Sequence, residues 1–184
     1  MVKKFKILYV TEAIPYLNKT FKYKNMHQLP KIEKIQLNRG LGISAQNTKY
    51  LKKNIEEFRL ITGQQPIITK AKKSIAGFKL RKNTELGITT TLRRAKMYSF
   101  FDRLINLVLP RIRDFRGLDP KNFDKNGNYT FGINDQLVFP EIDFESIDKT
   151  LGFNITIVTS AKTSNEGLAL LIKMGLPFII KSNN

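Results

Sequence analysis

Residues 86–110 read LGITTTLRRAKMYSFFDRLINLVLP, and two periods of apolar residues follow each other in this stretch. In residues 86–92, apolar side chains and Thr90 alternate with Gly87, Thr89 and Thr91, which predicts a strand with one apolar face and one threonine face. A spacing of three and four residues then predicts a helix that Pro110 ends. The residues on its apolar side are Met97, Phe100, Phe101, Leu104, Ile105 and Val108.

Strands and helices mix along the rest of the chain without a regular strand–helix–strand repeat. Further strands are predicted at 31–37, 129–133 and 153–159, a helix after the capping residues Asn47 and Thr48 that Gly63 ends, and a last helix at about 165–174. This order favours an α+β fold over a doubly wound one. We expect a single domain over residues 1–184, with an antiparallel sheet, helices packed on one face and long basic loops. Met1 to Asn25 is expected to form an N-terminal helical region, and Ile179 to Asn184 a tail.

The charge balance points to a polyanionic partner. The chain has 32 Lys and Arg against 15 Asp and Glu, a net charge of +17, and 41% of its residues are hydrophobic. It can therefore bury a core, and its excess of positive charge favours nucleic acid as the partner. No stretch reaches the roughly 20 apolar residues of a membrane span, and the N-terminus lacks a signal or transit pattern, so we expect no membrane partner.

The positive charges are concentrated in two segments. Five or six of them lie on a Gly-containing loop around Phe78, which suits phosphate neutralisation together with stacking on a base. The alternative is that Phe78 is a small hydrophobic anchor, because aromatic side chains are more often packed than stacked. The cations of the first segment are Lys70, Lys72, Lys73, Lys79, Arg81, Lys82, Arg93, Arg94 and Lys96. The second cluster, just past the long helix, is Arg111, Arg113 and Arg116. Arginines suit bidentate phosphate contacts.

An acidic segment follows, from Asp119 to Asp148. Its last four carboxylates are Glu141, Asp143, Glu145 and Asp148. It could contact a basic protein, or it could be a solvated surface. A carboxylate cluster for Mg²⁺ or acid–base catalysis is a further reading, but the spacing is equally that of an amphipathic edge strand. No His, Cys or second carboxylate group completes such a site, so we expect no catalytic residue, no metal and no cofactor.

Two other features carry little functional signal. Residues 40–45 fit a loose dinucleotide-binding pattern, but the acidic residue expected about 20 positions later is missing. His27 has no evident partner in the sequence, and the absence of cysteine excludes disulfides and cysteine-based zinc sites.

Several motifs, in collinear order, closely resemble those of bacterial-type large-subunit ribosomal protein five, a family of 5S ribosomal RNA binders. The resemblance extends from about Met26 to Phe178. Its motifs are residues 38–42 (NRGLG), 68–78 (ITKAKKSIAGF), 110–118 (PRIRDFRGL), 127–129 (GNY) and 139–143 (FPEID).

The resemblance implies a structural, non-enzymatic protein of the central protuberance of the large subunit. Its implied partners are 5S rRNA, 23S-type rRNA, peptidyl-site tRNA, neighbouring large-subunit proteins and the small-subunit head protein thirteen. By position in the motifs, Asn38, Gln64 and Thr91 resemble the family's polar contacts to 5S rRNA. The loop from Lys72 to Lys82 is similar to the tRNA-facing loop, and Glu141 to Asp148 to the region of an intersubunit bridge.

Three departures from the family pattern limit this transfer. Arg94 stands where the family usually has Gly, residues 125–127 (KNG) replace a Gly-Arg-Gly turn, and the tail extends past the usual end. A non-ribosomal RNA-binding module and a metal-dependent nuclease are kept as alternative functions. The many Lys, Asn and Ile residues indicate an AT-rich coding genome, which favours a plastid ribosome, with mitochondrial and bacterial cytoplasmic ribosomes open.

Overall fold

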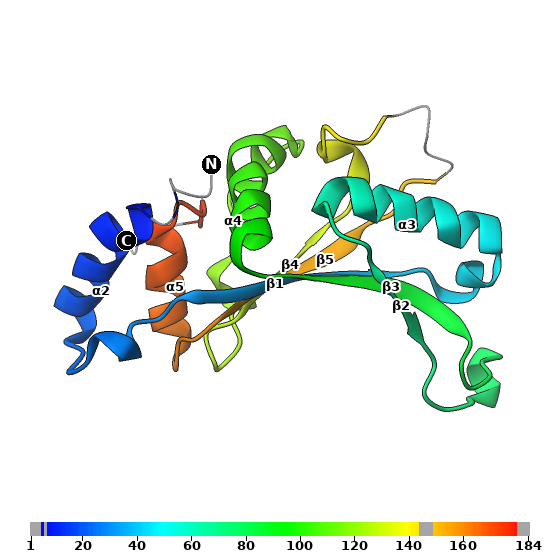
Figure 1. The fold of residues 1–184 in the computed structure, drawn as a ribbon, viewed down its shortest axis with the longest axis horizontal. Coiled ribbons are helices and arrows are strands. Elements are labelled where there is room, and N and C mark those ends of the chain that lie inside the picture. The colour runs from blue at the N-terminus through cyan, green and yellow to red at the C-terminus, as the bar shows by residue number, and fades with distance from the viewer. Residues whose placement is uncertain (1–4, 6, 144–148, 180–184) are drawn as a thin grey trace. The chain divides into compact units, whose positions relative to one another are not determined.

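The computed structural model describes residues 5, 7–143 and 149–179. Within them lies a five-stranded sheet with the strand order β2-β3-β1-β5-β4 (Figure 1). The strands are β1 (Ile32–Gly40), β2 (Ile67–Lys70), β3 (Glu85–Leu92), β4 (Tyr129–Ile133) and β5 (Phe153–Thr159). The helices are α2 (Ile14–Phe21), α3 (Thr48–Thr62), α4 (Arg94–Arg103) and α5 (Ser164–Lys173). The predicted α+β class with an antiparallel sheet is therefore confirmed.

Contacts within the chain define two compact units, which we describe separately. Unit 1 comprises Met1–Ile35, Arg93–Phe131 and Thr156–Asn184, and unit 2 comprises Gln36–Leu92 and Gly132–Ile155. That both units belong to one domain stays a prediction.

Helix α3 of unit 2 begins and ends where the sequence predicts. The Asn47 side-chain oxygen accepts hydrogen bonds from the backbone N–H groups of Lys49 and Tyr50, at 3.1 and 3.4 Å. Gly63, with φ = 64°, ends the helix in the left-handed conformation that glycine adopts without a steric penalty. Phe58 is fully buried, and its ring meets that of Phe153 edge to face at 5.5 Å. The helix thus covers one face of the unit 2 strands.

Strand β3 alternates as predicted. Ile88, Thr90 and Leu92 are buried, whereas Thr89 and Thr91 are only partly covered and lie on the opposite face. The strand pairs antiparallel with β2, with Ile67 opposite Thr89. Strand β2 was not predicted, because four residues that follow a proline give no clear alternation.

Gly87 lies where two backbones approach closely. A Cβ atom on this residue would lie 2.5 Å from the carbonyl oxygen of Arg39, well inside van der Waals contact. We therefore expect Gly87→Ala to lower the free energy of unfolding by about 1–3 kcal/mol, the usual cost of overpacking. Urea denaturation measures this change. Gly40→Ala is the control, because a Cβ at Gly40 meets nothing within 4 Å, and an equal loss in both variants would contradict the explanation.

In unit 1, the helical path that begins with α4 continues beyond the helix. A π-helical turn, Leu104–Val108, and a 3₁₀ turn, Leu109–Arg111, follow directly, with Pro110 in the first turn of the latter. The predicted apolar side is confirmed, since its residues are buried except Ile105, which is partly exposed. Phe5 packs edge to face on Phe101 at 5.3 Å, and α2 contacts α5. The bounds of β4 and β5 agree with the predicted strands.

The described part of the acidic segment differs from the edge strand considered above. The 3₁₀ turn Gln136–Val138 leads into a bend at residues 139–142, and no strand forms there. The backbone N–H of Ile142 donates to the carbonyl oxygen of Phe139, which closes a turn in place of a ladder. None of the helices in the described ranges is both long and apolar enough to cross a membrane.

Candidate RNA-binding surface

The face of the unit 2 sheet opposite α3 carries polar side chains, which we call the polar face. It follows from the alternation of two neighbouring strands, in which the intervening residues Leu37, Arg39 and Ile88 are buried. The polar face consists of Gln36 and Asn38 on β1, Thr69 on β2, and Thr89 and Thr91 on β3, and the exposed Ile67 of β2 lies on the same face opposite Thr89.

Hydrogen bonds order part of this face. The Thr89 hydroxyl donates to the carbonyl oxygen of Leu37 at 3.0 Å and accepts from the Gln36 amide at 3.4 Å. The Gln64 amide donates to the carbonyl oxygen of Thr91 at 3.2 Å. The structure thus brings Gln64 and Thr91 together, with Asn38 exposed on the neighbouring strand. Amide and hydroxyl groups can both donate to and accept from RNA 2′-hydroxyls and base edges.

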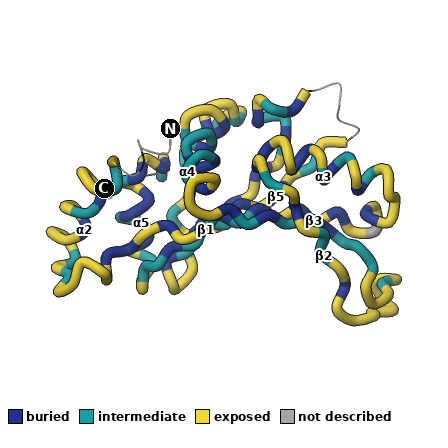
Figure 2. Tube along the Cα trace, viewed as in Figure 1, coloured by how far each residue is buried: buried dark blue, intermediate teal, exposed yellow. Residues whose placement is uncertain are grey.

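The loop between β2 and β3 carries the cations, and we call residues 71–83 the cationic loop. The five cations Lys72, Lys73, Lys79, Arg81 and Lys82 are all exposed. Figure 2 shows most of the loop beyond β2 in the colour of exposed residues. Ile75 and Leu80 form two backbone hydrogen bonds across the loop, and the backbone N–H of Lys82 donates to the Ser74 hydroxyl at 2.9 Å. The loop backbone is therefore held while its charged side chains reach solvent.

Phe78 lies at the end of this loop, with 67% of its surface exposed, and Ile75 is 46% exposed. A ring this exposed does not serve as an anchor within this chain, which leaves it free to stack on a partner. Lys70 differs from the other cations of the segment. Its ammonium lies 3.7 Å from the Glu85 carboxylate, so part of its charge is neutralised.

The cationic loop and the Gln64–Thr91 pair lie at opposite ends of β3. The loop projects from the β2–β3 hairpin beyond Glu85 (Figure 1). Six strand residues at about 3.3 Å each place Thr91 roughly 20 Å from Glu85. One part of a folded RNA can therefore contact the polar face while another part contacts the cationic loop.

The remaining predicted cations lie in unit 1. Arg93 and Arg94 are exposed, and Arg94 has φ = 52°. Arg111, Arg113 and Arg116 are also exposed. Of these, Arg113 lies 3.7 Å from the carboxylate of Asp114, and both side chains are almost fully in solvent, where such a pair contributes little.

The acidic residues are only partly within the described ranges. Glu141 is partly exposed and Asp143 is exposed, whereas Glu145 and Asp148 lie outside the described residues. Among residues 5, 7–143 and 149–179, no group of three or more His, Cys, Asp or Glu side chains is placed to hold a metal ion.

Comparison with known proteins assigns the family. Residues 25–81 match the model of ribosomal protein L5, and residues 85–178 match the model of the C-terminus of the same ribosomal family. The chain is 62% identical over 178 residues to the large ribosomal subunit protein uL5c of Heterosigma akashiwo, covering 97% of this chain and 98% of the relative. It is 54% identical to uL5 of Acaryochloris marina over the same share of each chain, and 58% identical over 171 residues to uL5 of Geotalea daltonii, covering 93% and 96%.

The chain belongs to the ribosomal protein L5 family. Members of this family are structural, non-enzymatic constituents of the ribosome, in its large subunit. The resemblance found in the motifs is thereby confirmed. Arg94 has φ = 52°, a backbone conformation that glycine adopts without penalty, which agrees with the expectation from the motifs that glycine usually stands at this position.

Sequence reasoning missed several residues of this L5-family protein. Gln36 and Thr69 belong to the polar face, and the period of two that marks Asn38 would have found Gln36.

Arg39 is the other missed residue, since it was seen only as part of a motif. It is fully buried, and its guanidinium donates to Glu57 at 2.8 Å, Asn54 at 2.9 Å and Gln136 at 2.8 Å. Burial lowers the pKa of the Arg39 guanidinium, and the ion pair with Glu57 opposes that shift. Arg39 therefore joins β1 to α3 and to the 3₁₀ turn Gln136–Val138.

Proposed function

We propose that this protein binds 5S rRNA through the polar face of unit 2 and anchors it in the central protuberance of the large subunit. The observation that carries the proposal is the grouping of Asn38, Gln64 and Thr91, the three positions whose motifs resemble 5S contacts, on and beside one solvent-accessible sheet face. Their amide and hydroxyl groups supply selectivity, because they can recognise ribose and base edges rather than phosphate alone.

The cationic loop supplies the second part of the proposal. Its exposed lysines and arginine, with Phe78 at the end, suit the backbone and an exposed base of a further RNA, and we assign the loop to peptidyl-site tRNA. A contact to 23S-type rRNA is assigned to the exposed arginines of unit 1, which are Arg93, Arg94, Arg111, Arg113 and Arg116. Glu141 and Asp143, with Glu145 and Asp148 outside the described residues, are assigned to a bridge with the basic small-subunit head protein thirteen.

We also propose that the ribosome concerned is a plastid ribosome. Relatives from Heterosigma akashiwo and Porphyra purpurea, at 62% and 56% identity, carry the plastid-type name uL5c. Neighbouring large-subunit proteins are further proposed partners.

Thr91→Val tests the polar face. This change keeps the shape of the side chain and removes one hydroxyl, so we expect discrimination between 5S rRNA and an unrelated structured RNA to fall by roughly three- to tenfold, the effect of one hydrogen bond. Filter binding with both RNAs measures the ratio of affinities. Thr130→Val, an exposed threonine of β4 in unit 1, is the matched control. An equal loss of affinity for both RNAs would count against a selective role of Thr91.

A further inference from the structure

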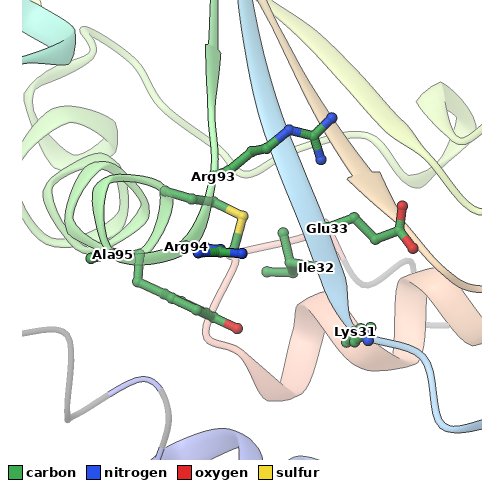
Figure 3. A pocket seen from close by; sticks show the side chains of 8 residues that line it. Lys31, Ile32, Glu33, Arg93, Arg94 and Ala95 are labelled. Carbon is green, nitrogen blue, oxygen red and sulfur yellow. The ribbon is translucent and has the colours of Figure 1, made fainter. Parts of the chain in front are cut away.

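Unit 1 contains an open pocket between the first residues of β1 and the start of α4, with a volume of about 600 Å³. We call it the β1–α4 pocket, and Figure 3 shows it from close by. It is lined by Lys31 and Ile32 from β1 and its approach, and by Arg93, Arg94, Met97 and Tyr98 where the chain leaves β3 and enters α4. Its volume lies in the range of pockets that hold small organic ligands.

The charge of the lining favours an anion. Lys31, Arg93 and Arg94 contribute three cations, and Glu33 contributes one carboxylate. Figure 3 shows Arg94 and Ile32 on one side of β1, with Arg93 and Glu33 on the other. The carboxylate therefore does not lie beside Arg94, and the side of the pocket at Arg94 presents a positive charge over apolar atoms.

The inner part of the pocket is apolar. Ile32 and Met97 are buried, with 6% and 2% of their surfaces exposed. Tyr98 is partly buried, burial raises the pKa of its phenol, and its hydroxyl is a hydrogen-bond donor at the pocket. Thioether and aromatic groups suit the flat face of a nucleobase, whereas a phosphate alone has no use for them.

Arg94 keeps its side chain at the pocket in an unfavourable backbone conformation. Its φ of 52° is the left-handed region, where any residue with a Cβ is destabilised relative to glycine. A strained, exposed arginine at the edge of a pocket is consistent with a binding role rather than a structural one.

We propose that the β1–α4 pocket binds one unpaired nucleotide of an RNA chain. Its phosphate contacts Arg94, and its base lies against Met97 and Ile32. The inference rests on the proposed function only in taking RNA as the partner, and it concerns unit 1 rather than the polar face of unit 2.

An NMR titration of the isotopically labelled full chain tests the pocket. Uridine and adenosine monophosphates are expected to shift the amide signals of residues 31–33 and 93–98, with dissociation constants on the order of 1–10 mM. Inorganic phosphate and the free nucleosides are expected to bind roughly tenfold more weakly, because each offers only half of the contacts. Equal binding of phosphate and nucleotide would reduce the pocket to a simple anion site and overturn the proposal. Shifts confined to other residues would overturn it as well.

Arg94→Gly separates binding from folding. We expect it to weaken nucleotide binding roughly tenfold, the effect of a charged hydrogen bond, while raising the Tm by about 2 °C because the left-handed backbone is relieved. Lys125→Ala, which removes an exposed charge of unit 1 that does not line the pocket, should change neither quantity. Unchanged nucleotide affinity in Arg94→Gly would overturn the assignment.

Failure of this proposal can be told apart from failure of the proposed function. Thr91→Val is expected to reduce 5S selectivity without changing nucleotide affinity, and Arg94→Gly is expected to do the reverse. If each variant changed both 5S selectivity and nucleotide affinity, the polar face and the β1–α4 pocket would not be independent binding surfaces.

Discussion

Arg39→Met is expected to lower the free energy of unfolding by about 3–5 kcal/mol, the usual result of removing one partner of a buried ion pair. The change leaves the Glu57 carboxylate, which lies 2.8 Å from the guanidinium, in the interior without its positive partner. Asn54 and Gln136 lose the same donor. The guanidinium carbon also lies 4.8 Å from the Phe58 ring centroid, a cation–π contact that methionine cannot make.

Urea denaturation followed by circular dichroism measures the loss, with Arg59→Met as the matched control. Arg59 pairs with Glu56 at 3.4 Å, but the two side chains are 60% and 61% exposed, so its removal should change stability by less than about 0.5 kcal/mol. The double variant with Arg39→Met and Glu57→Met is expected to recover part of the loss, because it no longer buries an unpaired charge. A single Arg39→Met variant within about 1 kcal/mol of the parent protein would contradict this account of the network.

Neutralising the cationic loop is expected to have the largest effect on RNA affinity. The variant replaces Lys72, Lys73, Lys79, Arg81 and Lys82 with alanine. If each cation neutralises one phosphate, the negative slope of log affinity against log salt becomes shallower by about 0.7–0.9 for each residue replaced. At about 0.15 M salt the affinity should fall on the order of 10²–10³-fold. Fluorescence anisotropy with tRNA across a salt series measures both quantities.

The control removes the same charge from other parts of the surface. It replaces the exposed Lys19, Lys24, Lys121, Lys125 and Lys162 with alanine. If the cationic loop binds RNA specifically, the control variant should change the slope clearly less than the loop variant does. Equal slopes in the two variants would mean that net charge, and not the loop, determines affinity.

Local patterns predicted most of the fold. Asn47 and Gly63 each lie directly beside the end of α3 that they determine, and the alternation of β5 is complete within residues 153–159. Such signals are local, and the structure confirms them. Strand β2 was missed because its four residues show no clear alternation and it depends on its pairing with β3. The bend at residues 139–142 was open to misreading because Glu141, Ile142 and Asp143 alternate as in a strand, although a turn forms there.

The candidate surface was likewise predicted only where its residues carry a local sequence signal. Asn38, Gln64 and Thr91 came from motifs and Thr89 from the alternation of its strand, whereas Gln36 became visible only when β1 and β3 were paired. The buried role of Arg39 could not be predicted, because its acceptors lie 15, 18 and 97 residues away in sequence. Arg94 was noticed as a departure from a family pattern, but its positive φ and its pocket required the structure.

The most direct test of the central claim is the binding of the purified protein to 5S rRNA, compared with an unrelated structured RNA across a salt series. Contacts through the polar face depend weakly on salt, whereas phosphate contacts through the loop depend on it strongly. We predict that both affinities fall as salt rises while the preference for 5S rRNA persists. Equal binding to both RNAs, lost together as salt rises, would contradict a selective polar face and leave only a general polycation.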